Sequence, residues 1–253
     1  MLATPATDTR QHTAGAVRLP VIEIFGPTIQ GEGPDAGVPA YFVRFGGCDY
    51  RCTWCDSMHA VDPAKVRANA ARLTADQIVQ QLGELGDGPG LVVLSGGNPA
   101  LLDLGALALA LKQDGRRVAV ETQGSRWRDW LADVDRLVIS PKPPSSGMAG
   151  AEELGTLEAF MSKVTFASAP ALKIVVFDQT DLEWAVARHR DYPRFPLFLS
   201  VGTDVGLGEE ETLGRLRERY RWLCETVARW PDLRDAHVQP QLHVIAWGTA
   251  TGV

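Results

Sequence analysis

The stretch Gly47-Cys-Asp-Tyr-Arg-Cys-Thr-Trp-Cys-Asp-Ser57 places three of the chain's four cysteines within eight consecutive residues. Three residues separate Cys48 from Cys52, and two separate Cys52 from Cys55. A loop of this length allows all three thiolates to point inward at one centre. The spacing therefore predicts a metal-binding loop.

The number of cysteines indicates which metal the loop binds. A structural zinc site takes four ligands, commonly from two paired cysteine or histidine motifs, and the chain has no second such pair. Three thiolates instead suit a 4Fe-4S cluster that leaves one iron free for a substrate or cofactor. We therefore predict a catalytic cluster on Cys48, Cys52 and Cys55. A zinc or non-enzymatic iron-sulfur module and an incidental cysteine cluster or disulfide are the alternatives.

The fourth cysteine, Cys224, is not expected to complete this ligand set. It belongs to an apolar pattern with a spacing of three and four residues, which is typical of one side of a helix. A buried apolar cysteine is the better interpretation of that pattern. The pattern is Leu213, Leu216, Tyr220, Leu223, Cys224 and Val227.

Composition and charge exclude several classes of protein. The 253 residues suffice for one large core, and 25 basic against 31 acidic residues give a net charge of −6, which argues against a nucleic-acid partner. No run approaches the ~20 apolar residues of a membrane span, and the N-terminus lacks the apolar core of a secretory signal. We expect a disordered tail over residues 1–17, a single domain over residues 18–253, no membrane partner, and a cytoplasmic location where the cluster stays reduced.

Continuous apolar segments alternate with helix-like segments from residue 19 onward. One helix begins with a capping box formed by Thr74 and Gln77. This alternation is typical of a parallel sheet that right-handed crossovers cover with helices. We therefore predict an α/β fold, an incomplete (β/α) barrel of about six parallel strands. Strands are expected at residues 20–25, 40–45, 91–95, 117–121, 136–140, 172–177, 196–201 and 242–247, and helices at 74–85, 101–112, 127–132, 181–190 and 209–230.

Polar and glycine-rich loops follow several of these strands. In a (β/α) barrel such loops meet at one face, where ligands bind. Each loop alone is more often a turn or a helix cap than a functional site, but together with the cysteine loop they predict a cavity. They are Ser95-Gly-Gly-Asn-Pro99, Glu121-Thr-Gln-Gly124 and Ser140-Pro-Lys-Pro-Pro144.

The first two strands carry a further polar group. The loop Gly26-Pro-Thr-Ile-Gln-Gly-Glu-Gly33 lets backbone approach a ligand closely and adds Gln30 and Glu32. Arg44 lies inside the apolar segment 40–45, where a guanidinium needs a partner. Either a protein acid such as Glu32 pairs with Arg44, or Arg44 holds an anionic ligand with its two-pronged fork.

The Cys-x-x-x-Cys-x-x-Cys motif, with Trp54 before the third cysteine, resembles that of the radical S-adenosylmethionine (SAM) enzymes. This resemblance implies that the open iron chelates the amino and carboxylate groups of SAM. Reductive cleavage would then yield a 5'-deoxyadenosyl radical, with flavodoxin or ferredoxin as an electron donor. The loop Gly96-Gly97-Asn98-Pro99 resembles the Gly-Gly-Glu-Pro loop of these enzymes, which receives the amino group of SAM. Asn98 keeps an acceptor oxygen but lacks the charge.

A narrower resemblance, to the 7-carboxy-7-deazaguanine synthase family, covers nearly the whole chain from Ile22 onward. It implies conversion of 6-carboxy-5,6,7,8-tetrahydropterin to 7-carboxy-7-deazaguanine with loss of ammonia, dependence on Mg²⁺, and a homodimer. A glycyl-radical activase is the enzymatic alternative. Whether the product serves tRNA queuosine or a deazapurine metabolite is left open. The matching segments are 25–33, 42–48, 52–57, 121–125, 140–146 and 239–248.

The resemblance also assigns site residues. Ser57 would be the protein ligand of Mg²⁺, although it could instead cap a turn, and His243, at the start of the expected last strand, could instead be a core histidine. Residues expected to contact substrate are Ile29, Gln30, Gly31, Glu32, Arg44, Ser95 and His243. Residues expected to contact SAM are Trp54, Asp56, Gly96, Gly97, Asn98, Glu121, Ser140, Pro141, Lys142, Ser200 and Val201.

Overall fold

The structure is a computed structural model that describes residues 17–148, 155–248, 250 and 252. The expected N-terminal tail falls almost wholly outside these residues. Nine strands form one sheet in the order β3-β1-β2-β4-β5-β6-β7-β8-β9 among the described residues. They are β1 (Leu19–Ile29), β2 (Pro39–Phe45), β3 (Ala71–Leu73), β4 (Leu91–Gly96), β5 (Arg117–Thr122), β6 (Arg136–Ile139), β7 (Ala171–Val176), β8 (Leu197–Val201) and β9 (His237–Gln239).

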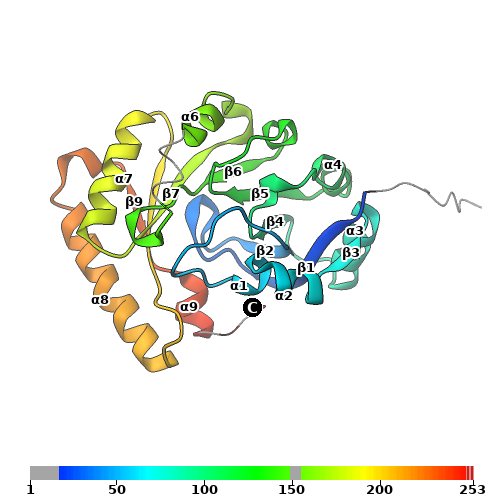
Figure 1. Cartoon of the computed structure of the whole chain (residues 1–253), viewed down its shortest axis with the longest axis horizontal. Coiled ribbons are helices and arrows are strands. Elements are labelled where there is room, and N and C mark those ends of the chain that lie inside the picture. The colour runs from blue at the N-terminus through cyan, green and yellow to red at the C-terminus, as the bar shows by residue number, and fades with distance from the viewer. Residues whose placement is uncertain (1–16, 149–154, 249, 251, 253) are drawn as a thin grey trace, which may run out of the picture.

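The sheet is parallel from β2 to β9 and open at its ends, which confirms the incomplete α/β barrel (Figure 1). β1 departs from the expected parallel pattern because it pairs antiparallel with β2 and β3. The physical reason is the short link between β1 and β2. A parallel pair needs a crossover of about a dozen residues or more, whereas an antiparallel pair closes with a short turn.

Helices cover the outer side of the curved sheet, with α3 and α4 over one half and α7 and α8 over the other (Figure 1). Thr74 and Gln77 form the predicted capping box at the start of α3. No helix of the described residues is long and apolar enough to cross a membrane. The helices are α1 (Met58–Val61), α2 (Pro63–Asn69), α3 (Ala75–Glu84), α4 (Gly105–Gln113), α6 (Thr156–Met161), α7 (Gln179–Asp191), α8 (Glu209–Val227) and α9 (Leu242–Trp247).

The prediction of a strand at residues 242–247 was wrong, because this segment is helix α9. β9 ends at Gln239, and Pro240, which follows, has no N–H for a strand ladder. The apolar run is also not fully buried, since Ile245 and Trp247 are exposed while Val244 is buried. The expected helix at 127–132 is likewise only a short 3-10 helix, Asp129–Ala132.

The two faces of the sheet bury different side chains. On the outer face, Leu94 and Ile174 belong to the main core that also contains helix residues such as Leu107 and Leu182. On the inner face, a small apolar cluster of Ala40, Leu91, Val93 and Ala119 fills one end. Successive side chains of a strand point to opposite faces, so residues such as Ser95 on β4, Glu121 on β5 and Lys173 on β7 line the inner cavity.

Candidate active site

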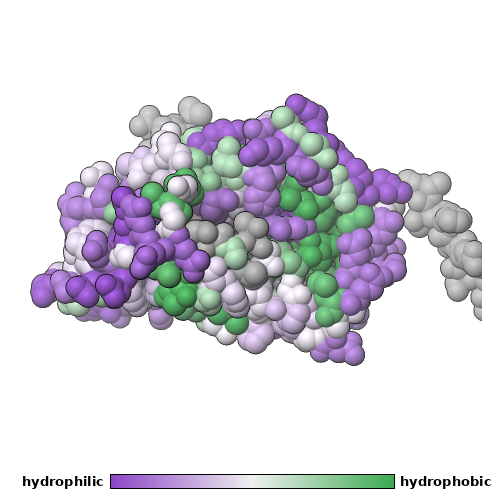
Figure 2. Space-filling view, turned by 90° about the horizontal axis from the view of Figure 1, so that it is seen from below, coloured by the Kyte–Doolittle hydropathy of each residue, from purple (hydrophilic) through white to green (hydrophobic). Residues whose placement is uncertain are grey.

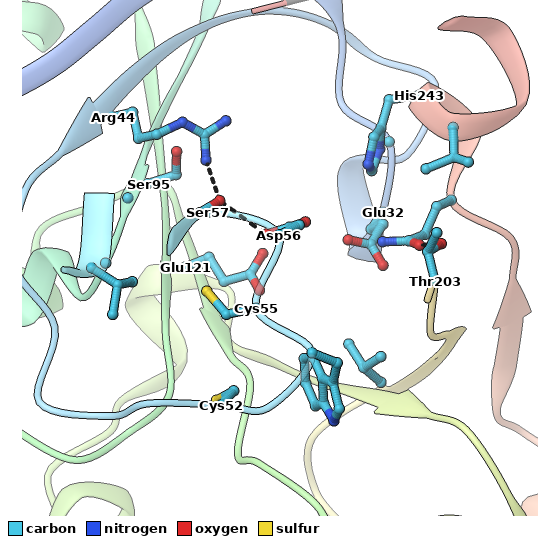
Figure 3. Close-up of a pocket in the computed structure, with 18 of the residues that line it drawn as sticks. Glu32, Arg44, Cys52, Cys55, Asp56, Ser57, Ser95, Glu121, Thr203 and His243 are labelled. Carbon is cyan, nitrogen blue, oxygen red and sulfur yellow. Dashed lines mark hydrogen bonds between the residues drawn. The ribbon is translucent and has the colours of Figure 1, made fainter. Parts of the chain in front are cut away.

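A cavity of about 510 Å³ lies at the carboxyl ends of β2, β4, β5 and β7 (Figure 3). It brings together most of the residues singled out from the sequence, although they come from separate loops. Asn98, Ser140, Pro141, Ser200 and Val201 do not line it. Those that do are Ile29, Gln30, Gly31, Glu32, Arg44, Cys48, Cys52, Trp54, Cys55, Asp56, Ser57, Ser95, Gly96, Gly97, Glu121, Lys142 and His243.

The cysteine loop, residues 47–57, is fastened to the loop after β4. The N–H of Asn98 donates to the carbonyl oxygen of Gly47 at 2.8 Å. A Cβ on Gly97 would come within 2.1 Å of the same oxygen, and Gly47 has a φ of +109°. Both positions therefore require glycine, one for close approach and one for its backbone conformation.

The three thiols are free and partly buried. Burial raises the pKa of Cys48 and Cys52, and it raises that of Cys55 to about 11, with Asp56 contributing. Metal binding must therefore displace protons from these thiols. Among the described residues, no three His, Cys, Asp or Glu side chains are grouped tightly enough to hold one ion. A 4Fe-4S cluster binds each thiolate at a different iron, so the donor set fits a cluster better than zinc.

Cys224 lies on α8 and lines a separate cavity beside Trp230. It is partly exposed, whereas the sequence pattern predicted a buried cysteine. The reason is its place at the border of the helix's apolar side: Leu223 next to it is fully buried.

Residues outside the cysteine loop fix the side chain of Trp54. Its Nε1 donates to Ser145 Oγ at 3.0 Å, and its ring lies 5.2 Å from that of Phe177 at the end of β7. Asp181 is fully buried and accepts from the N–H and the hydroxyl of Ser145 at 3.0 and 2.6 Å. Lys142 lies 6.0 Å above the indole and donates to Ser140 at 3.0 Å. The expected SAM residues 140–142 thus lie next to the cysteine loop, although only Lys142 reaches the cavity.

Both amide atoms of Asn98 have protein partners. Its Oδ1 accepts from Thr122 Oγ1 at 2.8 Å and from the N–H of Ala100 at 3.2 Å. Its Nδ2 donates to Asp49 and Ser125, each at 3.0 Å. Asn98 is therefore fully engaged in the protein, and its contact with SAM stays a prediction.

Asp49 is the partner that explains a neutral residue at position 98. Its carboxylate accepts from Asn98, from Gln123 at 2.5 Å and from Ser125 at 2.6 Å. A glutamate or aspartate at position 98 would place a second anion against Asp49. The Nε2 of Gln123 also lies 3.6 Å from Cys48 Sγ, so this hydrogen-bond network fixes the start of the cysteine loop.

Arg44 pairs with Glu23 through Nε, and not with Glu32. Its Nη1 donates to Ser57 Oγ at 2.8 Å, and Ser57 donates to Asp56 at 2.9 Å (Figure 3). His59 lies 3.4 Å from Glu23. Glu23 was not singled out from the sequence, although its position on β1 directly opposite Arg44 would have indicated it once the antiparallel register was known.

A second group, the carboxylate wall, consists of Glu32, Glu121, Lys173 and His243. The Nζ of Lys173 donates to Glu32 at 3.0 Å and lies 2.8 Å from a Glu121 oxygen. A Cβ on Gly31 would come within 2.1 Å of His243 Nδ1, so glycine permits this approach. Lys173 was missed, although a lysine in the apolar segment 172–177 is the same signal that pointed to Arg44.

Three buried oxygens beside the cavity make no hydrogen bond of good geometry among the described residues: Glu32 Oε1, Ser95 Oγ and Ser200 Oγ. The Ser200 hydroxyl nevertheless lies close enough to Glu32 to help lower the pKa of that carboxyl. Burial alone would raise the pKa of Glu32, but Lys173 and then His243 outweigh it, and the pKa is lowered. Glu32 is therefore an anion at neutral pH, and its Oε1 can still accept a hydrogen bond from a ligand. A buried polar atom without a partner is costly, which favours a ligand that donates to it.

Comparisons with known proteins show which family this chain resembles. A family model described as Radical SAM superfamily matches residues 42–142. The 7-carboxy-7-deazaguanine synthases of Bacillus cereus and Bacillus subtilis are each 42% identical to this chain over 240 residues. These matches cover 93% of this chain and 99% and 98% of the relatives. A crystal structure of QueE from Escherichia coli has the same fold, with a TM-score of 0.65, 22% identity, and coverage of 89% of this chain and 95% of that chain.

Proposed function

This chain belongs to the 7-carboxy-7-deazaguanine synthase family of radical SAM enzymes, and from that membership we propose its reaction. It converts 6-carboxy-5,6,7,8-tetrahydropterin to 7-carboxy-7-deazaguanine with loss of ammonia, as a step toward 7-deazapurines such as queuosine. The relatives support this reaction and not the alternative of a glycyl-radical activase.

One observation carries the proposal: a single cavity combines three free thiols with a cation at one end and a carboxylate at the other. Arg44 and Glu32 face the cavity from opposite sides of the cysteine loop (Figure 3). The substrate has a carboxylate at one end and the N–H donors of a pyrimidine ring at the other. The two ends of the cavity therefore complement the two ends of the substrate.

Cys48, Cys52 and Cys55 would hold a 4Fe-4S cluster, which supplies the electron that cleaves SAM. Trp54, Asp56, Gly96, Gly97, Glu121 and Lys142, which line the cavity, are proposed to contact SAM. Five further residues are also proposed to contact SAM, although they do not line the cavity: Asn98, Ser140, Pro141, Ser200 and Val201. The hydroxyl of fully buried Ser200 lies near Glu32 and makes no hydrogen bond of good geometry among the described residues, which fits a ligand at the end of β8.

The pyrimidine edge of the substrate is proposed to bind at the end of the cavity that contains Glu32. Its contacts there would be Glu32, Gln30 and the backbone of Ile29 and Gly31, with Ser95 and His243 beside it. The carbonyl oxygen of Gly31 accepts from the N–H of Leu242 at 3.1 Å, which fastens α9 to this edge. His243 lines the cavity and is only partly buried, which favours contact with substrate over a core position.

Ser57 is proposed as the protein ligand of Mg²⁺. Its hydroxyl lies between Arg44 and Asp56, and Mg²⁺ commonly takes few protein ligands and completes its octahedron with substrate oxygens and water. A divalent cation beside a guanidinium is unfavourable unless an anion lies between them. We therefore infer that Mg²⁺ and the substrate carboxylate bind together.

A homodimer, a flavodoxin or ferredoxin donor and a cytoplasmic location complete the proposal, with residues 18–253 as one domain. The exposed apolar residues Val205, Ile245 and Trp247 are consistent with a protein contact near α9. Figure 2 shows the face that includes this side of the molecule, with apolar areas between hydrophilic ones.

The reaction is tested with anaerobically reconstituted protein, 6-carboxytetrahydropterin, SAM, dithionite and Mg²⁺, followed by mass spectrometry. We expect 7-carboxy-7-deazaguanine and 5'-deoxyadenosine without any added protein. Cleavage of SAM without conversion of the pterin would contradict the proposal.

The same assay tests Mg²⁺ binding with Ser57→Ala. We expect product formation to fall while reductive cleavage of SAM persists, because the ion orients substrate and does not touch the cluster. Unchanged turnover with unchanged Mg²⁺ dependence would reduce Ser57 to a turn residue.

A further inference from the structure

Lys173 is a buried cation between two anions that the proposed function assigns to different ligands. Its side chain is 5% exposed, on the inner face of β7, and its Nζ lies 3.0 Å from Glu32 and 2.8 Å from Glu121. Glu32 belongs to the proposed substrate contact and Glu121 to the proposed SAM contact. One ammonium thus joins the walls of both binding regions.

The charges of this group depend on one another. A buried carboxylate without a cation loses its hydration and tends to bind a proton, and a buried ammonium without an anion tends to lose one. Burial alone would lower the pKa of Lys173, but Glu121 and Glu32 outweigh it and the pKa is raised. Burial alone would raise the pKa of Glu32, but Lys173 and His243 outweigh it and the pKa is lowered. Removing one partner of such a group leaves an uncompensated buried charge.

The two carboxylate oxygens of Glu32 are in different environments. Oε2 accepts from Lys173, whereas Oε1 is buried and accepts no hydrogen bond of good geometry among the described residues, with the Ser200 hydroxyl nearby. Lys173 therefore fixes both the charge and the rotation of the carboxylate, so that Oε1 stays an acceptor. If Glu32 were protonated, one of its oxygens would become a donor and would repel an N–H of the ligand.

We propose that Lys173 is a positioning residue that keeps Glu32 and Glu121 as oriented anions, so that the carboxylate wall selects ligands with adjacent N–H donors. The chemical class is the 2-amino-4-oxopyrimidine edge of a pterin or guanine-like ring. This inference rests on the proposed function and adds the residue that makes its substrate wall an acceptor surface. Lys173 acts through the two glutamates and not on the reacting atoms.

The proposal predicts a pH dependence that a merely structural lysine would not produce. In the wild type Glu32 is ionised across neutral pH, so the affinity for a pterin is nearly constant. In Lys173→Met the main cation is lost while burial remains, so the pKa of Glu32 rises and the affinity falls as pH decreases. Besides Lys173, the groups facing Glu32 are Glu121 from β5, Ser200 from β8 and His243 from α9.

The experiment measures binding of 6-carboxypterin, a fluorescent oxidised analogue of the substrate, to the reconstituted holoenzyme between about pH 5.5 and pH 7.5, where the pyrimidine ring keeps its N–H donors. We expect less than about a twofold change in Kd for the wild type. For Lys173→Met we expect weakening of about tenfold or more at the acidic end, since one unit of pKa shift corresponds to a factor of ten, with recovery toward high pH. Lys173→Arg keeps the cation and should stay flat with pH.

Two further variants separate this effect from others. Lys173→Met combined with Glu32→Gln has no titrating carboxylate at position 32, so its weakened binding should vary much less with pH than that of Lys173→Met. His243→Gln, combined with Lys173→Met, should retain the pH dependence, which excludes the imidazole as its source. Iron content and thermal denaturation verify that each variant is folded.

The outcomes distinguish the inference from the proposed function. If 6-carboxypterin binds the wild type but Lys173→Met loses the same factor of affinity at every pH, Lys173 is only structural and the inference is overturned. If 6-carboxypterin does not bind the wild type, the proposed substrate class fails and the inference fails with it. Flat binding to the wild type and to Lys173→Arg, with acid-sensitive binding to Lys173→Met, supports both.

Discussion

The cysteine loop and the carboxylate wall are two sides of one cavity that are built in opposite ways. The loop takes all three thiols from one short stretch and is partly exposed. The wall takes its charges from the β1–β2 link, β5, β7 and α9, and its lysine is buried. Chemistry in the loop is therefore local and depends on each residue separately, whereas chemistry in the wall depends on groups that hold one another's charge.

The largest expected effect tests the local character of the loop. Replacing Cys48, Cys52 or Cys55 by Ala should abolish a stable cluster of about four irons and with it the cleavage of SAM, since each thiolate holds a separate iron. Cys224→Ala is the matched control and should keep the cluster. Iron analysis and absorption spectra measure both, and loss of the cluster in the Cys224→Ala protein would show that the ligand set has four members.

The next effect concerns Arg44, which lies between the two sides. Arg44→Lys keeps the charge but loses the fork that reaches Glu23 and Ser57. We expect KM for the pterin to rise about tenfold or more, because a hydrogen bond to a charged group contributes ~1.5–3 kcal/mol. Steady-state kinetics measure this change.

A substrate analogue without the carboxylate is the control for Arg44. It should bind the wild type poorly and lose little more in Arg44→Lys, because both changes remove the same contact. Additive losses would show that Arg44 is not the partner of the carboxylate. A lowered melting temperature with near-normal KM would instead indicate that Arg44 serves only its pair with Glu23.

A smaller effect, on stability, is expected at the pair Asn98 and Asp49, which joins the loop after β4 to the cysteine loop. Asn98→Asp replaces the donor that faces Asp49 by a second anion and should reduce the free energy of unfolding by about 1–3 kcal/mol, because position 98 is buried although Asp49 is exposed. The double variant with Asp49→Asn restores one donor and one acceptor and should recover part of the loss. Chemical denaturation measures both, and tighter binding of SAM by Asn98→Asp would favour the ligand role of position 98.

The smallest effect concerns α2, the second helix after the cysteine loop. Asp62 accepts from the N–H groups of Ala64 and Lys65 at 2.7 and 3.3 Å at the start of α2, and these hydrogen bonds lower its pKa. Its stabilisation is therefore present above the unfolded-state pKa and is lost as pH falls through the folded-state pKa. Asp62→Ala should lower the melting temperature slightly at neutral pH, and the difference should vanish in acid. A difference that persists unchanged in acid would contradict this assignment, and Asp62→Asn should lose less because it keeps an acceptor.

Some of the fold and site could be inferred from residue patterns. The alternation of apolar strands with helices predicted the open α/β barrel, and the capping box at Thr74 was confirmed. The segment 242–247 misled because its apolar residues resemble a strand, although Pro240 ends the ladder and α9 exposes two of them. Hydrophobic pattern alone does not separate a short buried strand from a short helix.

The order of residues along the chain was enough to identify the cysteine loop, because its three donors are neighbours and local spacing alone brings them together. The pairing of Arg44 with Glu23, of Asn98 with Asp49, and of Lys173 with Glu32 and Glu121 came only from the tertiary structure. These partners are far apart in the chain and meet only when the strands adopt their register. The tertiary structure therefore decides whether each buried charge has a partner. Burial makes an unpaired charge costly, and a nearby opposite charge then determines whether the group stays ionised.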